Sequence, residues 1–313
     1  MSRALEEFLR GIDATQKAAE RISSPSIGGQ IRRTPEQLQL NGLHVVTFAL
    51  LEEFLRQRTI EVLGALGRSG AKFIDFPGPM QLQILQETFK GITFHLNKGE
   101  DDRLTKLQVE TINLHTTADE NQNFSPSEFC FGKSQSNISL RQITEFLNSF
   151  GIQADSAFGT LLDRLSLQHL GDAGTIFKKV SENRHAAAHA FSLDFRHTEF
   201  IEDLKLGYKL LAFIYDTVLS QTTKSLKDSI IKKRAFQPTT AESYPLRSVR
   251  FDSIAQEWKV ERLLPSHTET LRPIPKNRLE ASLERLKTGR HDKDDTVFII
   301  DSNGALVNWV QPI

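Results

Sequence analysis

Residues 200–218 read FIEDLKLGYKLLAFIYDTV, and this stretch decides the fold class of the chain. Its large apolar side chains recur every three or four positions, at Phe200, Leu204, Tyr208, Leu211, Tyr215 and Val218. Because an α-helix turns once in about 3.6 residues, this spacing places all of them on one face. The stretch therefore predicts a helix that faces the core. We expect the helix to continue to Lys232-Lys233-Arg234, whose charges suit the C-terminal end of a helix dipole.

The same helical spacing dominates the chain before this stretch. It predicts helices over residues 5–12, 43–66, 82–92, 139–150 and 157–167. Residues 104–114 fit either a helix or a strand. The polar segment 116–137, rich in Asn, Ser and Gln, is expected to be a long surface loop. These patterns predict a mainly α fold, with an N-terminal helical extension (1–35) and a helical domain (36–236).

The pattern changes after the sequence Gln237-Pro238-Thr239-Thr240, which has the composition of a linker. Beyond it, short β-rich runs predict strands at 249–251 and 258–260, and a helix is expected over 277–286. Residues 297–307 resemble a β-hairpin, because Asn303-Gly304 suits a tight turn between two β-rich flanks. Residues 237–313 are therefore predicted to form a small α+β C-terminal domain.

Composition limits the classes of function. The 313 residues carry 39 basic and 39 acidic side chains, which argues against a strongly basic nucleic-acid coat protein but leaves room for a local RNA-binding patch. Cys130 is the only cysteine, so neither an internal disulfide nor a multi-cysteine zinc site can form. No apolar run approaches the ~20 residues that a membrane-spanning helix needs. Because the N-terminal residues also carry acids, we expect a cytoplasmic protein with no membrane partner.

One short segment carries the pattern of a catalytic site: Arg184-His185-Ala186-Ala187-Ala188-His189. On a helix, His185 and His189 lie about 40° apart and share a face, whereas Arg184 lies about 140° from His189. The long side chain of Arg184 can still reach an anion that the histidines bind. The three alanines favour a helix and leave room for a ligand or a second helix.

This arrangement resembles the signature of the HEPN-domain ribonucleases. That signature consists of an arginine, a polar neighbour and a histidine farther along the same helix. On that resemblance, which covers residues 36–225, Arg184 is the motif arginine, His185 its polar neighbour and His189 the motif histidine. Within the family, the pattern Arg-His-x-x-Ala-His resembles that of the RiboL-PSP group. The resemblance implies a HEPN-like helical bundle and a metal-independent endoribonuclease without a cofactor. It also implies a homodimer that shares its site, a toxin–antitoxin or antiphage setting, and an antitoxin or regulatory protein as partner.

The chemistry of these residue types suits RNA as the substrate. A neutral imidazole, with an ordinary pKa of about 6.5, can remove the proton from a ribose 2′-OH. Only RNA carries this internal nucleophile beside its phosphate. A guanidinium is well suited to the negative charge that develops on the phosphate oxygens. The products would be a 2′,3′-cyclic phosphate and a free 5′-OH, and His185 would orient the phosphate or protonate the leaving oxygen.

Other interpretations of the same residues stay open. Arg184 could pair with Glu182 or Asp194 at the surface, and both histidines could be ordinary surface residues. His185 and His189 could also bind zinc together with Asp194 and His197, although Ala186 stands where a zincin has glutamate.

The wider function also has alternatives. Lys232, Lys233 and Arg234 could bind the RNA backbone, or they could simply be the solvated end of a helix. The whole chain could be a non-catalytic HEPN relative that binds RNA, a nucleotide or a protein. A third alternative is an interaction scaffold, in which the Arg–His segment only caps and packs.

Overall fold

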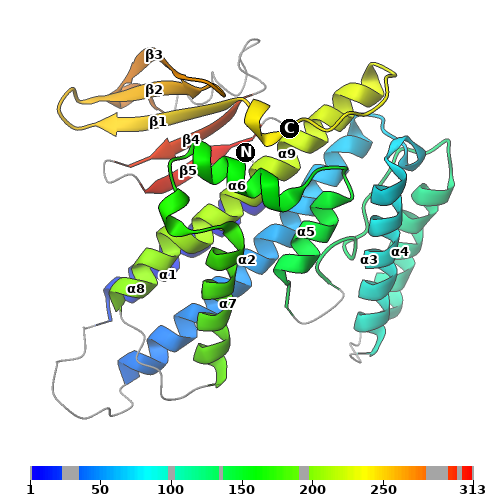
Figure 1. Ribbon diagram of the computed structural model, residues 1–313. Helices are drawn as coiled ribbons and strands as arrows, with labels where there is room; N and C mark the ends of the chain where they lie inside the picture. The colour runs from blue at the N-terminus through cyan, green and yellow to red at the C-terminus, as the bar shows by residue number, and fades with distance from the viewer. Residues whose placement is uncertain are drawn as a thin grey trace.

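The computed structural model describes residues 2–22, 35–97, 103–133, 137–189, 197–279, 295–301 and 305–311, with helices first and strands last (Figure 1). The α-helices are α1 (Arg3–Glu20), α2 (Pro35–Arg68), α3 (Gly78–Asn97), α4 (Arg103–Ala118), α5 (Leu140–Asn148), α6 (Ala154–Arg164), α7 (Ala173–His189), α8 (His197–Glu202) and α9 (Lys209–Ile231). A π-helix, Asp203–Tyr208, joins α8 to α9. The strands are β1 (Leu246–Asp252), β2 (Glu257–Leu263), β3 (Thr268–Pro275), β4 (Thr296–Ile300) and β5 (Leu306–Val310). The protein is therefore mainly α, with a small sheet towards its C-terminus.

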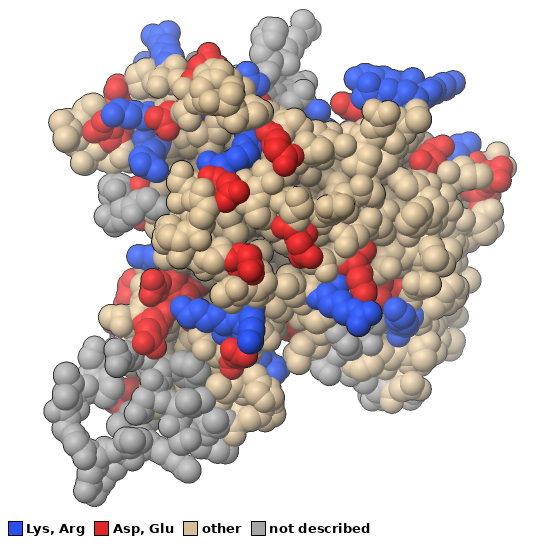
Figure 2. All heavy atoms as spheres, viewed as in Figure 1, with Lys and Arg blue, Asp and Glu red and all other residues tan. Residues whose placement is uncertain are grey.

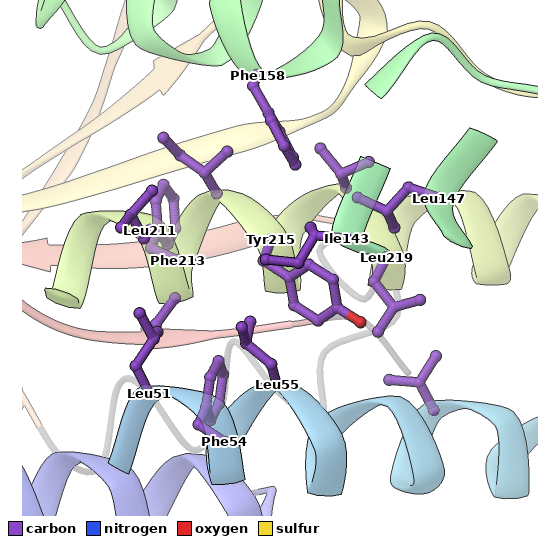
Figure 3. Packing of buried hydrophobic residues seen from close by; sticks show 14 of the residues in the cluster. Leu51, Phe54, Leu55, Ile143, Leu147, Phe158, Leu211, Phe213, Tyr215 and Leu219 are labelled. Atoms are coloured by element: carbon purple, nitrogen blue, oxygen red, sulfur yellow. The ribbon is translucent and has the colours of Figure 1, made fainter. Parts of the chain in front are cut away.

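The core lies between the two longest helices, α2 and α9. Figure 3 shows side chains of α2 facing side chains of α9, with α5 and α6 closing the cluster from the other side. The labelled members are Leu51, Phe54, Leu55, Ile143, Leu147, Phe158, Leu211, Phe213, Tyr215 and Leu219. From Leu210 to Thr223 every residue of α9 is buried, so this helix is enclosed on all sides rather than along one stripe.

Helix α1 is tied to α2 at its first turn. The Ser2 hydroxyl accepts a hydrogen bond from the Leu5 backbone N–H and caps the helix. It also donates to Glu61 of α2, and that carboxylate accepts from the Ala4 backbone N–H at 2.8 Å. Further along, the rings of Phe8 and Phe54 pack with their centroids 4.9 Å apart. The N-terminal helix therefore belongs to the same core as the rest of the bundle.

The five strands form one sheet in the order β3-β2-β1-β4-β5, in which only the β1–β4 pair is parallel. Trp309 of β5 joins the sheet to the helices. Its ring packs against Phe8, Phe54 and Phe213, and its indole N–H donates to buried Asp216 of α9 at 2.7 Å. The sheet and the helices therefore share one hydrophobic core.

Several sequence expectations are confirmed: the helices before residue 200, a helix rather than a strand at 104–114, and strands around 249–251, 258–260 and 297–307. The stretch that starts at Phe200 is helical, but the π-helix interrupts its α-helical period, and α9 ends at Ile231, before the basic run. Strand β3 was not predicted. The turn at Asn303-Gly304 lies outside the described residues, and of the helix over 277–286 only its start is described, within a short 3-10 helix, Lys276–Arg278.

The prediction of a surface loop over 116–137 is wrong for residues 124–132, many of which are buried. Phe124, Phe129, Cys130 and Phe131 are buried, because these apolar residues cover the core beside α2 and α3. Within the described ranges, no helix is both long enough and apolar enough to cross a membrane.

Candidate active site

Helix α7 is anchored to the core by its first half only. Its buried residues are Ala173, Ile176, Phe177 and Val180, and the ring of Phe177 lies 6.0 Å from that of Phe48 on α2. After Val180 no residue of α7 is buried. The last turns of this helix therefore stand clear of the core, and they carry the Arg–His segment.

His185 and His189 form a pair on the exposed side of these last turns. Both residues are exposed, and their ring centroids lie 4.7 Å apart with the planes tilted by 51°. The predicted shared face is therefore confirmed. Two imidazoles at this separation can serve one ligand as a proton acceptor and a proton donor, provided that one is neutral and the other protonated.

Arg184 precedes His185 in α7, and its side chain is directed at Asn137, just before α5. It is half-buried, and its guanidinium Nη2 donates to the Asn137 side-chain oxygen at 3.1 Å. Glu182, a partner considered from the sequence, instead lies 3.8 Å from Lys178, and Asp194 is outside the described residues. Arg184 is therefore held by a neutral amide, which leaves its positive charge available for an anion.

A buried carboxylate lies close to this arginine. Glu52 of α2 is 7% exposed, and it accepts a hydrogen bond from the Ile138 backbone N–H at 2.5 Å. Burial raises the pKa of Glu52, and the nearby charges of Arg56 and Arg184 oppose that rise. Arg56 also donates to the Gly132 carbonyl at 2.8 Å. Two residues of α2 thus hold the chain at Gly132 and at Ile138, on either side of the segment that leads to Asn137.

A second buried carboxylate fixes α7 from the α8–α9 side. Asp203, the first residue of the π-helix, is 3% exposed and accepts from the Asn183 side-chain amide at 2.8 Å. It also pairs with Lys179 at 2.6 Å, and this hydrogen bond raises the pKa of Lys179. A Cβ on Gly207 would lie 2.9 Å from Val180, so the π-helix and α7 are in close contact. Asn183 and Arg184 are therefore consecutive residues with separate anchors.

The zinc interpretation gains no support from this geometry. A ring nitrogen of His197 lies 2.9 Å from the Ala19 carbonyl oxygen, so this ring is directed at α1 rather than at the histidine pair. Asp194 is not among the described residues. Across the described part of the chain, no group of three or more His, Cys, Asp or Glu side chains is arranged to hold a metal ion.

The structure does not bring the basic run to the histidine pair. Lys232, Lys233 and Arg234 are exposed and follow the last turn of α9. Figure 1 places that end at the upper right, whereas α7 ends at the bottom of the view. Figure 2 shows basic side chains gathered at the upper right, over the end of α9. Only an RNA long enough to span the bundle could contact both places.

The chain matches no protein-family model, and neither a curated protein nor a solved structure is significantly similar to it. Sequence reasoning named Arg184, His185 and His189 as candidates but did not name Asn137, which is 47 positions from Arg184. It also missed Glu52 and Asp203. The available signal for both acids was their position within an apolar helical run. An acid in such a run is expected to be buried, and a buried acid is expected to have a partner.

Proposed function

We propose that this protein is a metal-independent endoribonuclease of the HEPN type, with its site at the end of α7. The observation that supports this proposal best is the exposed His185–His189 pair, with ring centroids 4.7 Å apart, next to an arginine whose position is fixed by Asn137. An acid, a base and a fixed positive charge are the groups that RNA cleavage requires. Within the described part of the chain, no third His, Cys, Asp or Glu side chain joins the two imidazoles as a metal ligand.

The proposed reaction starts with a neutral imidazole that removes the proton from a ribose 2′-OH. The 2′-oxygen then attacks the adjacent phosphorus, and the bond to the 5′-oxygen of the next nucleotide breaks. The other, protonated imidazole donates its proton to that leaving oxygen. Arg184 stabilises the negative charge on the non-bridging oxygens. The products are a 2′,3′-cyclic phosphate and a 5′-OH, and we assign the role of the base to His189.

We also propose that two copies of the chain share one cleft. On the ideal helix, Arg184 lies about 140° from His189, so a single helix presents an incomplete site. Ala186, Ala187 and Ala188 leave space for a second helix beside the pair. Light scattering is expected to give about twice the chain mass of 35.4 kDa. A monomer that retains its full specific activity on dilution would refute the shared cleft.

The biological setting follows from the same resemblance. A ribonuclease of this kind needs control in the cell, so we propose a toxin–antitoxin or antiphage setting with an antitoxin or regulatory protein as partner. The charges of Lys232, Lys233 and Arg234 make this run a secondary contact for a long RNA.

The test is cleavage of total RNA or tRNA by the purified protein in excess EDTA. Arg184→Ala and His189→Ala are each expected to lose activity, and the loss of the acid–base role alone costs about 10²–10⁴-fold. His169→Ala, at an exposed histidine of the 3-10 helix Gln168–Leu170, is the matched control and should retain activity. Strict dependence on added Zn²⁺ would refute the proposal, and RNA binding without cleavage would favour the non-catalytic alternative.

A further inference from the structure

Within the described part of the chain, the Arg184 guanidinium makes one hydrogen bond, and its partner is Asn137. The amide oxygen accepts from Nη2 at 3.1 Å. An arginine has five N–H donors in a planar fork, so this contact restrains the guanidinium plane and leaves the other donors for a phosphate. Because the amide is neutral, it restrains the group without cancelling its charge.

Asn137 is itself well positioned, because the two residues that follow it are fixed. Ile138 is 2% exposed, and its backbone N–H is held by buried Glu52. Ser139 is the N-cap of α5, and its hydroxyl and backbone exchange hydrogen bonds with Gln142 in a capping box. Asn137 therefore projects from a point where α2 and α5 are joined.

The surroundings of Glu52 explain how α2 can hold a buried acid. An ionised carboxylate is costly to bury unless hydrogen bonds and positive charges compensate it. Here the Ile138 N–H supplies a hydrogen bond, and Arg56 lies 3.9 Å away. The charge of Arg184 also favours the ionised form of Glu52. The same carboxylate thus fixes the backbone next to Asn137 and lies within electrostatic range of the arginine that Asn137 holds.

We propose that Asn137 is a positioning residue for the Arg184 guanidinium and that Glu52 holds Asn137 in place. This inference rests on the proposed ribonuclease function, because it assigns the two residues a task at the same site. Neither residue needs to contact the RNA. Their effect is to hold the positive charge where the phosphate develops its negative charge, so that the guanidinium does not have to be immobilised during the reaction.

The first experiment compares kcat and KM for RNA cleavage by the wild type, Asn137→Ala and Asn137→Asp. Loss of a hydrogen bond to a charged group predicts that Asn137→Ala lowers kcat about tenfold or more, with KM changed less than about threefold. Asn137→Asp pairs with the arginine and neutralises it, so KM is expected to rise about tenfold. Asn97→Ala, at an exposed asparagine that ends α3, is the matched control and should match the wild type.

A double-mutant cycle separates positioning from a general structural role. If Asn137 acts through Arg184, then Asn137→Ala has no further effect on kcat in an Arg184→Ala background. Effects that multiply in the double variant would overturn the proposal, as would a wild-type kcat for Asn137→Ala.

Glu52 is tested by a pair of substitutions. Glu52→Gln keeps an oxygen that accepts from the Ile138 N–H, whereas Glu52→Ala removes it. Glu52→Gln is therefore expected to retain more of kcat than Glu52→Ala, and Glu52→Ala is expected to resemble Asn137→Ala. Circular dichroism confirms that each variant folds. Equal losses in both Glu52 variants would contradict the assigned role.

A physical readout tests positioning without catalysis. In arginine-labelled protein, the NMR signals of the Arg184 guanidinium are assigned by their absence in Arg184→Lys. These signals should show restricted rotation of the guanidinium in the wild type and free rotation in Asn137→Ala. If the wild type cleaves no RNA but shows this difference, the proposed function fails and the positioning of the guanidinium stands. If the wild type cleaves RNA and rotation is the same in both proteins, the positioning fails alone.

Discussion

His44 is predicted to make the stability of the helical bundle depend on pH. This histidine of α2 is 1% exposed, and its ring packs edge-on against Phe200 with the centroids 4.6 Å apart. Burial, reinforced by the charge of Lys179, lowers the pKa of His44 to about 4. The folded protein therefore keeps His44 neutral at pH values where an exposed histidine is protonated.

The size of the effect follows from the two pKa values. The ordinary pKa of histidine, 6.5, applies to the unfolded chain, and the folded value is about 4. Between these values the unfolded chain binds more protons, so the free energy of unfolding falls as the pH drops. A difference of about 2.5 pH units corresponds to about 3 kcal/mol over the whole window. This contribution is fully present above pH 6.5 and is lost as the pH falls through about 4.

The assay is urea unfolding at pH 7.5 and pH 4.5 for the wild type and His44→Phe. The variant cannot be protonated at this position, so its free energy of unfolding should fall by about 2.5 kcal/mol less than that of the wild type between the two pH values. Carboxylates that titrate in the same range contribute equally to both proteins and cancel. His169→Phe is the exposed control and should behave like the wild type. Equal pH dependence in the wild type and His44→Phe would show that His44 does not cause the loss of stability at low pH.

Two further predictions concern a buried ion pair and the close packing at a glycine. Asp216→Ala removes the carboxylate that pairs with buried Arg58 at 2.6 Å and accepts from the Trp309 indole N–H, so that Arg58 keeps the ion pair with partly exposed Glu61 at 3.1 Å. The loss of both buried contacts should lower the free energy of unfolding by about 3–5 kcal/mol in denaturant titrations; a loss below about 1 kcal/mol would contradict this. Gly67→Ala should unfold at much lower temperature, because its Cβ would lie 1.8 Å from the Phe124 carbonyl oxygen. Gly42→Ala, with open space around its Cβ, should instead gain about 0.5–1 kcal/mol, and equal effects of the two substitutions would be evidence against this packing.

Much of the helical fold could be predicted from the sequence because the apolar residues repeat with the period of an α-helix. The π-helix could not, because it depends on contact between two helices distant in sequence. The only local signal was Gly207 within an apolar run, and its meaning required the position of Val180. Strand β3 was missed because Pro273 and Pro275 argue against a strand, and the structure places them at the edge of the sheet, where prolines are tolerated.

The candidate site, too, could be predicted only in part from the sequence. The spacing of Arg184, His185 and His189 is local, so the sequence could predict that the two histidines share a face. The partners of the arginine could not be predicted in the same way. Asn137 lies in a polar segment that gave no periodic signal, and Glu52 is one of two consecutive acids in α2. Only the packing of α2 beside α7 and α5 shows which asparagine and which acid matter.

In the proposed function, the residues at the end of α7 make a ribose 2′-OH attack its neighbouring phosphate. The most direct measurement uses an RNA oligonucleotide and a copy with one 2′-deoxy nucleotide at the cut position, both incubated in EDTA, with mass spectrometry of the products. We expect the RNA to yield a 2′,3′-cyclic phosphate and a 5′-OH, and the deoxy copy to stay intact at that position. Cleavage of the deoxy copy at the same position, or wild-type cleavage of the RNA by His189→Ala, would contradict the proposed function.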